Sequence, residues 1–150
     1  MRIPLFFFLV LSCLIVSCGN SEDKAIDDVL SARKHAFETG DVDLYMTLIA
    51  PDYKQEKKGK VIGLEEIKKN FVVNTKLFDS VHITNSDRTI YMDGGKAEVF
   101  QKTQVDALDD EGKHRLNLKE KILLANENGK WVIVSESEQD FFYGYVFGRN

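Results

Sequence analysis

Three turn signals in the second half of the chain constrain the fold more than any other feature. Asp93-Gly94-Gly95, Asp109 to Gly112 and Asn128-Gly129 supply the positive φ angles that tight hairpin turns need, and runs rich in Val, Ile, Thr, Tyr and Phe flank each of them. We therefore expect residues 80–138 to form an antiparallel meander of four strands. Such a sheet must bury one face, and the amphipathic material that can cover it lies in residues 22–78.

That covering segment predicts three helices. Residues 22–39 place their apolar side chains on one helical face, and Gly40 suits the left-handed position that follows a helix. A second, shorter helix is expected over residues 41–50, and a third over residues 63–78. Residues 52–60 are charged and are expected to form a loop or a short hairpin strand. Helices gathered on one side of an antiparallel sheet make a single α+β domain.

The first residues are expected to be a targeting signal and not part of the domain. Arg2 precedes an apolar run that ends at Ile15-Val16-Ser17-Cys18 and is too short to span a membrane. This motif resembles the lipobox of bacterial lipoproteins, whose cysteine is acylated and becomes the new N-terminus. It implies a lipoprotein signal peptide at residues 1–17, and an acylated Cys18 with a linker at residues 18–21. The alternative is an ordinary secretory signal or an uncleaved anchor.

Cleavage before Cys18 leaves 133 of the 150 residues and removes Cys13, so the mature domain is expected to hold no disulfide. Without Arg2, 19 Lys and Arg stand against 24 Asp and Glu, a net charge of −5. This charge argues against nucleic acid or anionic lipid as a partner. Acyl chains on Cys18 would make membrane attachment effectively permanent. We expect an extracytoplasmic protein, on the periplasmic side of an outer membrane in preference to an inner membrane.

The order of several short motifs resembles nuclear transport factor 2-like (SnoaL-like) domains. The motifs are Ala36 to Asp43, Ala50-Pro51-Asp52-Tyr53, a turn at Gly59, Gly63 to Ile67, and Gly129 to Ile133. The resemblance covers residues 22–138 and implies a cystatin-like cone. In this fold an antiparallel sheet of four to six strands wraps over three N-terminal helices and leaves a cavity at its open end. It implies little about activity, because the superfamily holds isomerases, dehydratases, transport adaptors and small lipoproteins without assigned activity.

Two charged residues stand where apolar ones are expected. Arg33 lies on the apolar stripe of the first helix, and Glu120 has the same strand parity as Leu118 and Ile122. Because burying either charge alone would cost several kcal/mol, each needs a partner or a wet cavity. One hypothesis is that they line the cavity and bind a polar ligand, with Glu120 as a weak candidate general base. The other is a structural ion pair, an Arg33 that reaches the rim, or a bulge that turns Glu120 outward.

Three tyrosines are further candidates for the cavity. Tyr45, Tyr53 and Tyr91 can present phenols as hydrogen-bond donors, although aromatic residues more often pack with a wet tip. Tyr53 is favoured because it lies in a motif, and Trp131 is expected in the core. The candidate ligand-binding residues are therefore Arg33, Tyr53, Tyr91 and Glu120. No catalytic set of the superfamily's enzymes can be matched to this chain.

The histidines indicate neither a metal site nor a catalytic pair. His35 falls on the polar face of the first helix, His82 alternates with apolar neighbours, and His114 lies next to a charged turn. They do not have metal-ligand spacing, and the sequence contains no nucleophile motif or phosphate-binding loop. We therefore expect no metal and no cofactor.

Residues 139–150 form an aromatic tail that includes Phe141-Phe142-Tyr143. It is expected to add an edge strand or close the mouth of the cone, to form a homodimer or partner surface, or to rest on the membrane. The leading functional hypothesis is a membrane-anchored lipoprotein whose cone is a non-catalytic domain that binds a small molecule or a protein. The alternatives are an isomerase-, dehydratase- or hydrolase-type enzyme and an accessory subunit of an envelope complex.

Overall fold

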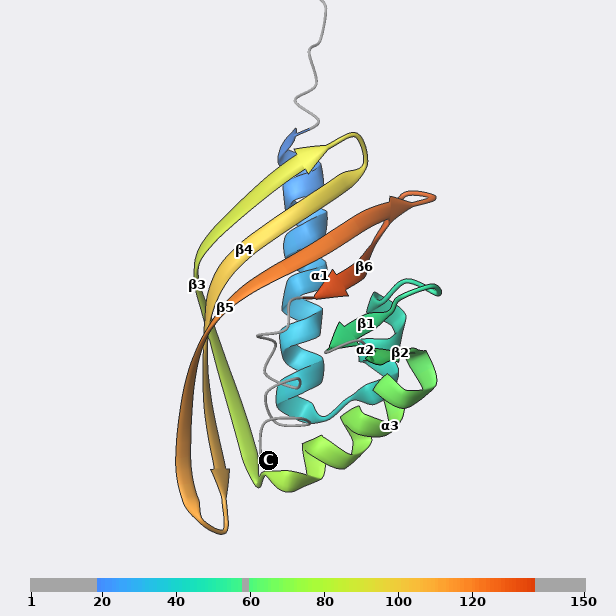
Figure 1. Cartoon of the computed structure of the whole chain (residues 1–150). Coiled ribbons are helices and arrows are strands. Elements are labelled where there is room, and N and C mark those ends of the chain that lie inside the picture. Colours follow the sequence, from blue (N-terminus) through green and yellow to red (C-terminus); the bar gives the residue numbers. More distant parts are fainter. Residues whose placement is uncertain (1–18, 58–59, 137–150) are drawn as a thin grey trace, which may run out of the picture.

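The computed structural model describes residues 19–57 and 60–136, and its elements follow the predicted order (Figure 1). The predictions for the signal peptide, Cys18 and the aromatic tail fall on residues 1–18 and 137–150, outside this described part. In chain order the elements are α1 (Gly19–Thr39), α2 (Val42–Leu48), β1 (Gln55–Lys57), β2 (Lys60–Ile62), α3 (Leu64–Asn74), a 3-10 turn (Thr75–Leu77), β3 (Ser80–Asp93), β4 (Lys96–Asp109), β5 (Gly112–Glu127) and β6 (Lys130–Glu136).

The last four strands form one antiparallel sheet in the order β3-β4-β5-β6. The predicted turns join them: Gly94 and Gly95 have φ angles of 52° and 85°, and Asn128 and Gly129 have φ angles of 54° and 87°. These are the left-handed conformations that two-residue hairpins require. The predicted four-stranded meander is therefore confirmed. β1 and β2 pair with each other as a separate two-stranded hairpin.

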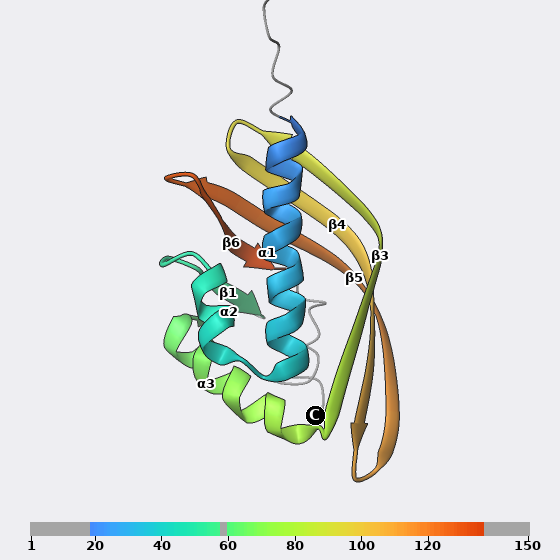
Figure 2. The ribbon, with the colours of Figure 1, turned by 180° about the vertical axis from the view of Figure 1, so that it is seen from behind.

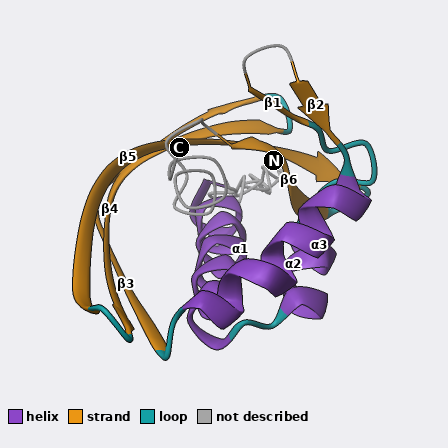
Figure 3. Ribbon diagram, turned by 60° about the horizontal axis from the view of Figure 1, so that its bottom comes forward, coloured by secondary structure: helices purple, strands orange, loops and turns teal. Residues whose placement is uncertain are grey.

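The sheet curls around α1, as the view from below in Figure 3 shows. The front and back views place α1 along the concave side of the sheet, where it contacts β3 and β6 (Figures 1 and 2). The inward side chains of α1 and the sheet share one buried core, which includes Ile26, Leu30, Phe37, Val99, Val105, Ile122, Leu124, Trp131 and Ile133. Tyr45 of α2 and Phe71 of α3 belong to the same core. The predicted α+β cone over three helices is confirmed.

A bulge in β3 decides which of its side chains face the interior. The register of β3 against β4 shifts between Ser86 and Thr89, where Asp87 has a φ angle of 50°. An extra residue reverses the alternation of a strand. Ile83 is buried before the bulge, and after it Ile90 packs against the core.

A second register shift lies at the last strand. Leu123 pairs with Ser135, whereas Leu124 pairs with Ile133, so one residue of β6 has no opposite partner on β5. The shift turns Glu136 to the same side as Ile133, although the two residues are three positions apart and would otherwise face opposite sides. Both side chains are buried.

The connection between α1 and α2 has the predicted form. Gly40 has a φ angle of 71°, and Oδ1 of Asp41 accepts a hydrogen bond of 2.9 Å from the backbone N of Leu44. A Cβ on Gly40 would lie 3.2 Å from the Cβ of Thr75, so this glycine also permits the end of α3 to approach.

The start of α1 corrects one expectation. We expected residues 18–21 to form a linker, but the helix already begins at Gly19. Glu22 in the first turn stabilises a helix N-terminus, because its charge complements the helix dipole. Within residues 19–57 and 60–136, no helix has the length and hydropathy needed to cross a membrane.

Candidate functional site

Arg33 projects from α1 into the interior of the cone and is only 4% exposed. Its Nη2 lies 3.2 Å from Oε1 of Glu120 on β5, and its Nε donates to Oε1 of Glu136 on β6. Its guanidinium carbon also lies 4.5 Å from the centre of the Phe37 ring. The contact between Arg33 and Glu120 that the sequence suggested is present. A second carboxylate, which sequence reasoning missed, shares the same guanidinium.

Glu136 also accepts hydrogen bonds from two tyrosines. Tyr45 and Tyr53 each donate their phenol O–H to Oε2 of Glu136, both at 2.8 Å. Both tyrosines are buried, and the Tyr45 ring stacks on Phe71 with 5.0 Å between the ring centres. Three donors from separate parts of the chain therefore meet at one carboxylate.

Glu120 is held from the neighbouring strand. Its Oε2 accepts a 2.9 Å hydrogen bond from Nε2 of Gln101 and another from the hydroxyl of Thr103. Gln101 stands directly opposite Glu120 in the β4–β5 ladder, and both β4 residues are buried. Sequence reasoning also missed this pair, although a signal exists: Gln101 and Thr103 share the strand parity of Val99 and Val105.

These residues form one polar network, which we define as Arg33, Tyr45, Tyr53, Gln101, Thr103, Glu120 and Glu136. It continues toward the surface, because Nε of Arg88 donates to Oε1 of Gln101 at 3.0 Å and Nη1 of Arg88 pairs with Asp27 on the exposed side of α1. Through these contacts α1 is tied to β3, β4, β5 and β6. The polar network and Arg88 together join the first helix to all four strands of the sheet.

The environment of Glu120 determines its charge. Burial raises the pKa of Glu120, but the charge of Arg33 and the hydrogen bonds from Thr103 and Gln101 outweigh burial, so its pKa lies below the ordinary glutamate value. Glu120 is thus ionised at neutral pH. Both oxygens of Glu120, and both of Glu136, already accept hydrogen bonds within the protein.

Tyr91 lies elsewhere, which corrects its assignment to the cavity. Its side chain is 61% exposed and packs edge to face against Phe100 with 5.9 Å between the ring centres. The bulge at Asp87 explains this position: Tyr91 has the parity of Ile83 in the sequence, but the extra residue turns it to the opposite face. Tyr53, in contrast, reaches the polar network.

The histidines lie on the outside of the cone. His35 and His82 are exposed, as expected, and Nε2 of His114 lies 2.8 Å from Oδ1 of Asp109. Among the described residues, no three His, Cys, Asp or Glu side chains gather closely enough to hold a metal ion.

Comparison with known proteins gives the fold. No protein-family model matches the sequence, and no curated protein matches it significantly. Solved structures do match. A putative dehydratase from the NTF2-like family of Streptomyces avermitilis has a TM-score of 0.69 at 12% identity, and the match covers 79% of this chain and 94% of that one.

Two further structures have other descriptions. A protein of unknown function with a cystatin-like fold, from Nostoc punctiforme, has a TM-score of 0.64 at 18% identity and covers 77% of this chain and 88% of that one. The association domain of CaMKII from C. elegans has a TM-score of 0.63 at 20% identity, with coverages of 78% and 94%. At these identities the likeness shows a shared fold and nothing about a shared activity.

Proposed function

We propose that this domain, which has the nuclear transport factor 2-like fold, is the non-catalytic binding domain of a lipoprotein that Cys18 anchors to a bacterial membrane outside the cytoplasm. One observation supports the proposal that the domain is not a catalyst: both oxygens of each carboxylate in the polar network accept hydrogen bonds from other residues of the protein. Arg33, Tyr45 and Tyr53 bind Glu136, while Arg33 and two β4 side chains bind Glu120.

A general base must accept a proton from its substrate, and its efficiency is greatest when its pKa lies near the working pH. Glu120 has a lowered pKa, and its oxygens face Arg33, Gln101 and Thr103. These properties suit a structural ion pair that holds the helix against the sheet better than they suit an acid–base catalyst.

The anchoring part of the proposal rests on the lipobox-like run Ile15 to Cys18. Because α1 begins at Gly19, directly after Cys18, the folded domain would start at the lipid anchor with almost no intervening chain. The periplasmic side of an outer membrane is the favoured location.

Replacing Cys18 with alanine tests the anchor. We expect the native chain to incorporate a fatty-acid label and to sediment with membranes, and C18A to lose the label and leave the membrane fraction almost completely, since lipid attachment provides the binding energy. Cys13→Ala is the matched control, because Cys13 lies within the segment that cleavage removes. Continued labelling of C18A in the native host would contradict the proposal.

An enzyme that uses the cone is the second candidate function. Two phenols and a guanidinium converge on the buried Glu136, and glutamate and tyrosine are among the residues that act as general acids and bases in enzymes. One similar structure is described as a putative dehydratase. A pKa of Glu120 near neutrality would favour this candidate over the binding domain.

We also propose a protein partner for this domain, which is either a second copy of the chain in a homodimer or another protein of an envelope complex. Two of the similar structures are described as a hub and an association domain of CaMKII. On the present chain the exposed aromatic pair of Tyr91 and Phe100 offers a contact surface on the outer face of the sheet.

A further inference from the structure

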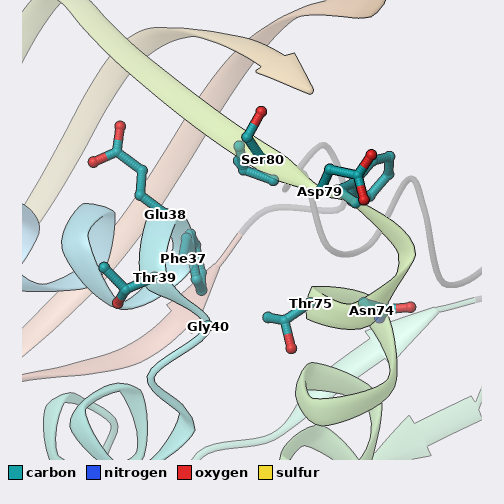
Figure 4. Close-up of a pocket in the computed structure, with 10 residues that line it drawn as sticks. Phe37, Glu38, Thr39, Gly40, Asn74, Thr75, Asp79 and Ser80 are labelled. Atoms are coloured by element: carbon teal, nitrogen blue, oxygen red, sulfur yellow. The ribbon is translucent and has the colours of Figure 1, made fainter. Parts of the chain in front are cut away.

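A pocket of about 230 Å³ opens beside the polar network, where the end of α1 faces the end of α3 and the start of β3. Figure 4 shows Thr39 and Gly40 on one side and Thr75 and Asn74 across from them, with Asp79 and Ser80 at the start of β3 on the side of Asn74. The lining residues are Phe37, Glu38, Thr39, Gly40, Asn74, Thr75, Phe78, Asp79, Ser80 and Val81. This volume is below the ~300–1,000 Å³ typical of sites for drug-sized molecules, so the pocket suits a small ligand.

Asn74 is the unusual member of this lining. It is 7% exposed, and its Nδ2 has no hydrogen-bond partner in the described structure. A buried donor without an acceptor destabilises a fold, and natural proteins retain few of them. Nδ2 itself has almost no accessible surface, so rotation of the Asn74 amide into the pocket would be needed for it to donate to a carbonyl or hydroxyl oxygen of a ligand.

The charged groups of the pocket are both acceptors. Glu38 and Asp79 are carboxylates, and the ten lining residues include no Lys, Arg or His. The hydroxyls of Thr39 and Thr75 donate to backbone carbonyls at 2.8 and 3.3 Å, which leaves their oxygens to accept. A cation is therefore favoured in this pocket.

The carboxylate of Glu38 already interacts with three groups of the protein. Oε1 of Glu38 accepts from the backbone N of Ile83 at 2.7 Å and lies 3.2 Å from Nδ1 of His82 and 3.8 Å from Nζ of Lys34. Asp79 is exposed at the pocket rim. It is therefore the carboxylate better placed to attract an ammonium group.

We propose that this pocket binds a small organic amine that carries a carbonyl or hydroxyl oxygen next to an apolar body. The oxygen accepts from Nδ2 of Asn74, the ammonium group faces Asp79, and the apolar body packs on the rings of Phe37 and Phe78. The inference rests on the proposed function, since it names the site and the ligand class of a binding domain. Phe37 joins the pocket to the polar network, because the Arg33 guanidinium lies over the same ring.

The test uses phenylalaninamide and the full mature chain. At pH 6.5, below the ~7.7 of an ordinary α-amino group, this probe is a cation with a carbonyl oxygen and an aromatic ring. We expect NMR titration to shift the side-chain amide of Asn74 and the backbone amides of Gly40 and Thr75. Phenethylamine, without the carbonyl, and hydrocinnamamide, without the ammonium group, should each bind more weakly.

Asn74→Leu separates a ligand contact from a structural one. We expect N74L to bind phenylalaninamide about tenfold more weakly, the effect of losing one buried hydrogen bond, and to bind phenethylamine as before. Its melting temperature should be equal to or above that of the wild type, because leucine removes an unsatisfied donor. Lys76→Ala, at an exposed position on the same turn, should change neither affinity nor melting temperature.

Asp79→Asn provides a second variant on an exposed side chain that does not threaten folding, and a two- to fivefold weaker affinity for phenylalaninamide is expected. The inference is wrong if phenylalaninamide does not bind, if N74L binds it as the wild type does, or if N74L unfolds. The inference is also wrong if the NMR chemical-shift changes centre on another surface. In that case the proposed binding function would remain, with its site at that other surface. Chemical turnover of a substrate would contradict the proposed function and leave the pocket assignment intact.

Discussion

Replacement of Arg33 with methionine is expected to lower the free energy of unfolding by about 3–5 kcal/mol at neutral pH. Methionine keeps much of the side-chain volume but leaves Glu120 and Glu136 as two buried carboxylates on one site, without the guanidinium that bridges them. Urea denaturation followed by the fluorescence of Trp131, the single tryptophan and 4% exposed, measures the change.

Lys34→Met is the matched control for this variant. Lys34 neighbours Arg33 on α1, but its side chain is 35% exposed and its ion pair with Glu38 is long, at 3.8 Å. We expect a loss below about 1 kcal/mol. The loss in R33M should also persist at high salt, because buried charges are poorly screened. An R33M variant as stable as K34M would show that Arg33 does not hold the cone together.

Replacement of Glu136 with leucine is expected to destabilise the domain by a similar amount, about 3–5 kcal/mol. The change removes the acceptor that Arg33, Tyr45 and Tyr53 share. Glu136→Gln keeps one acceptor oxygen and should lose less. The same urea denaturation compares the two variants.

Two conservative variants calibrate that result. Tyr45→Phe and Tyr53→Phe each remove a single phenol donor, and each should cost about 1 kcal/mol. Because both phenols bind the same oxygen, their effects should be non-additive with E136L. If E136L lost no more stability than either tyrosine variant, Glu136 would not be the centre of the polar network.

The sequence predicts the fold well because its signals are local. Turn residues such as Asn128-Gly129 set the strand boundaries, and Gly40 with Asp41 separates the first two helices. Glu120 was assigned correctly to the interior because β4 and β5 pair without a register shift from residue 96 to residue 125. Simple alternation holds along that ladder.

The sequence fails where a bulge changes the alternation. One bulge turns Tyr91 outward and another turns Glu136 inward, and neither is visible from period-two counting. Asp87, a residue that tolerates a positive φ angle, is a weak local sign of the first. The sequence contains no sign that Asn74 is a candidate site residue, because an unpartnered buried amide is a property of the tertiary structure.

We propose that the polar network is a structural core and not acid–base machinery. A carboxyl whose pKa is lowered by folding stabilises the protein above its unfolded-state pKa, and this contribution disappears as the pH falls through the folded-state pKa. For Glu120 the loss is therefore expected in acid, below about pH 4.3, and Glu120→Gln should reduce that acid-dependent loss.

Titration of the Glu120 carboxyl carbon by NMR in the full mature chain tests this claim most directly. We predict a pKa below the ordinary glutamate value of about 4.3, because Arg33, Thr103 and Gln101 stabilise the ionised form. A pKa raised toward neutrality would contradict the account and would instead assign Glu120 the role of a general acid or base in an enzyme.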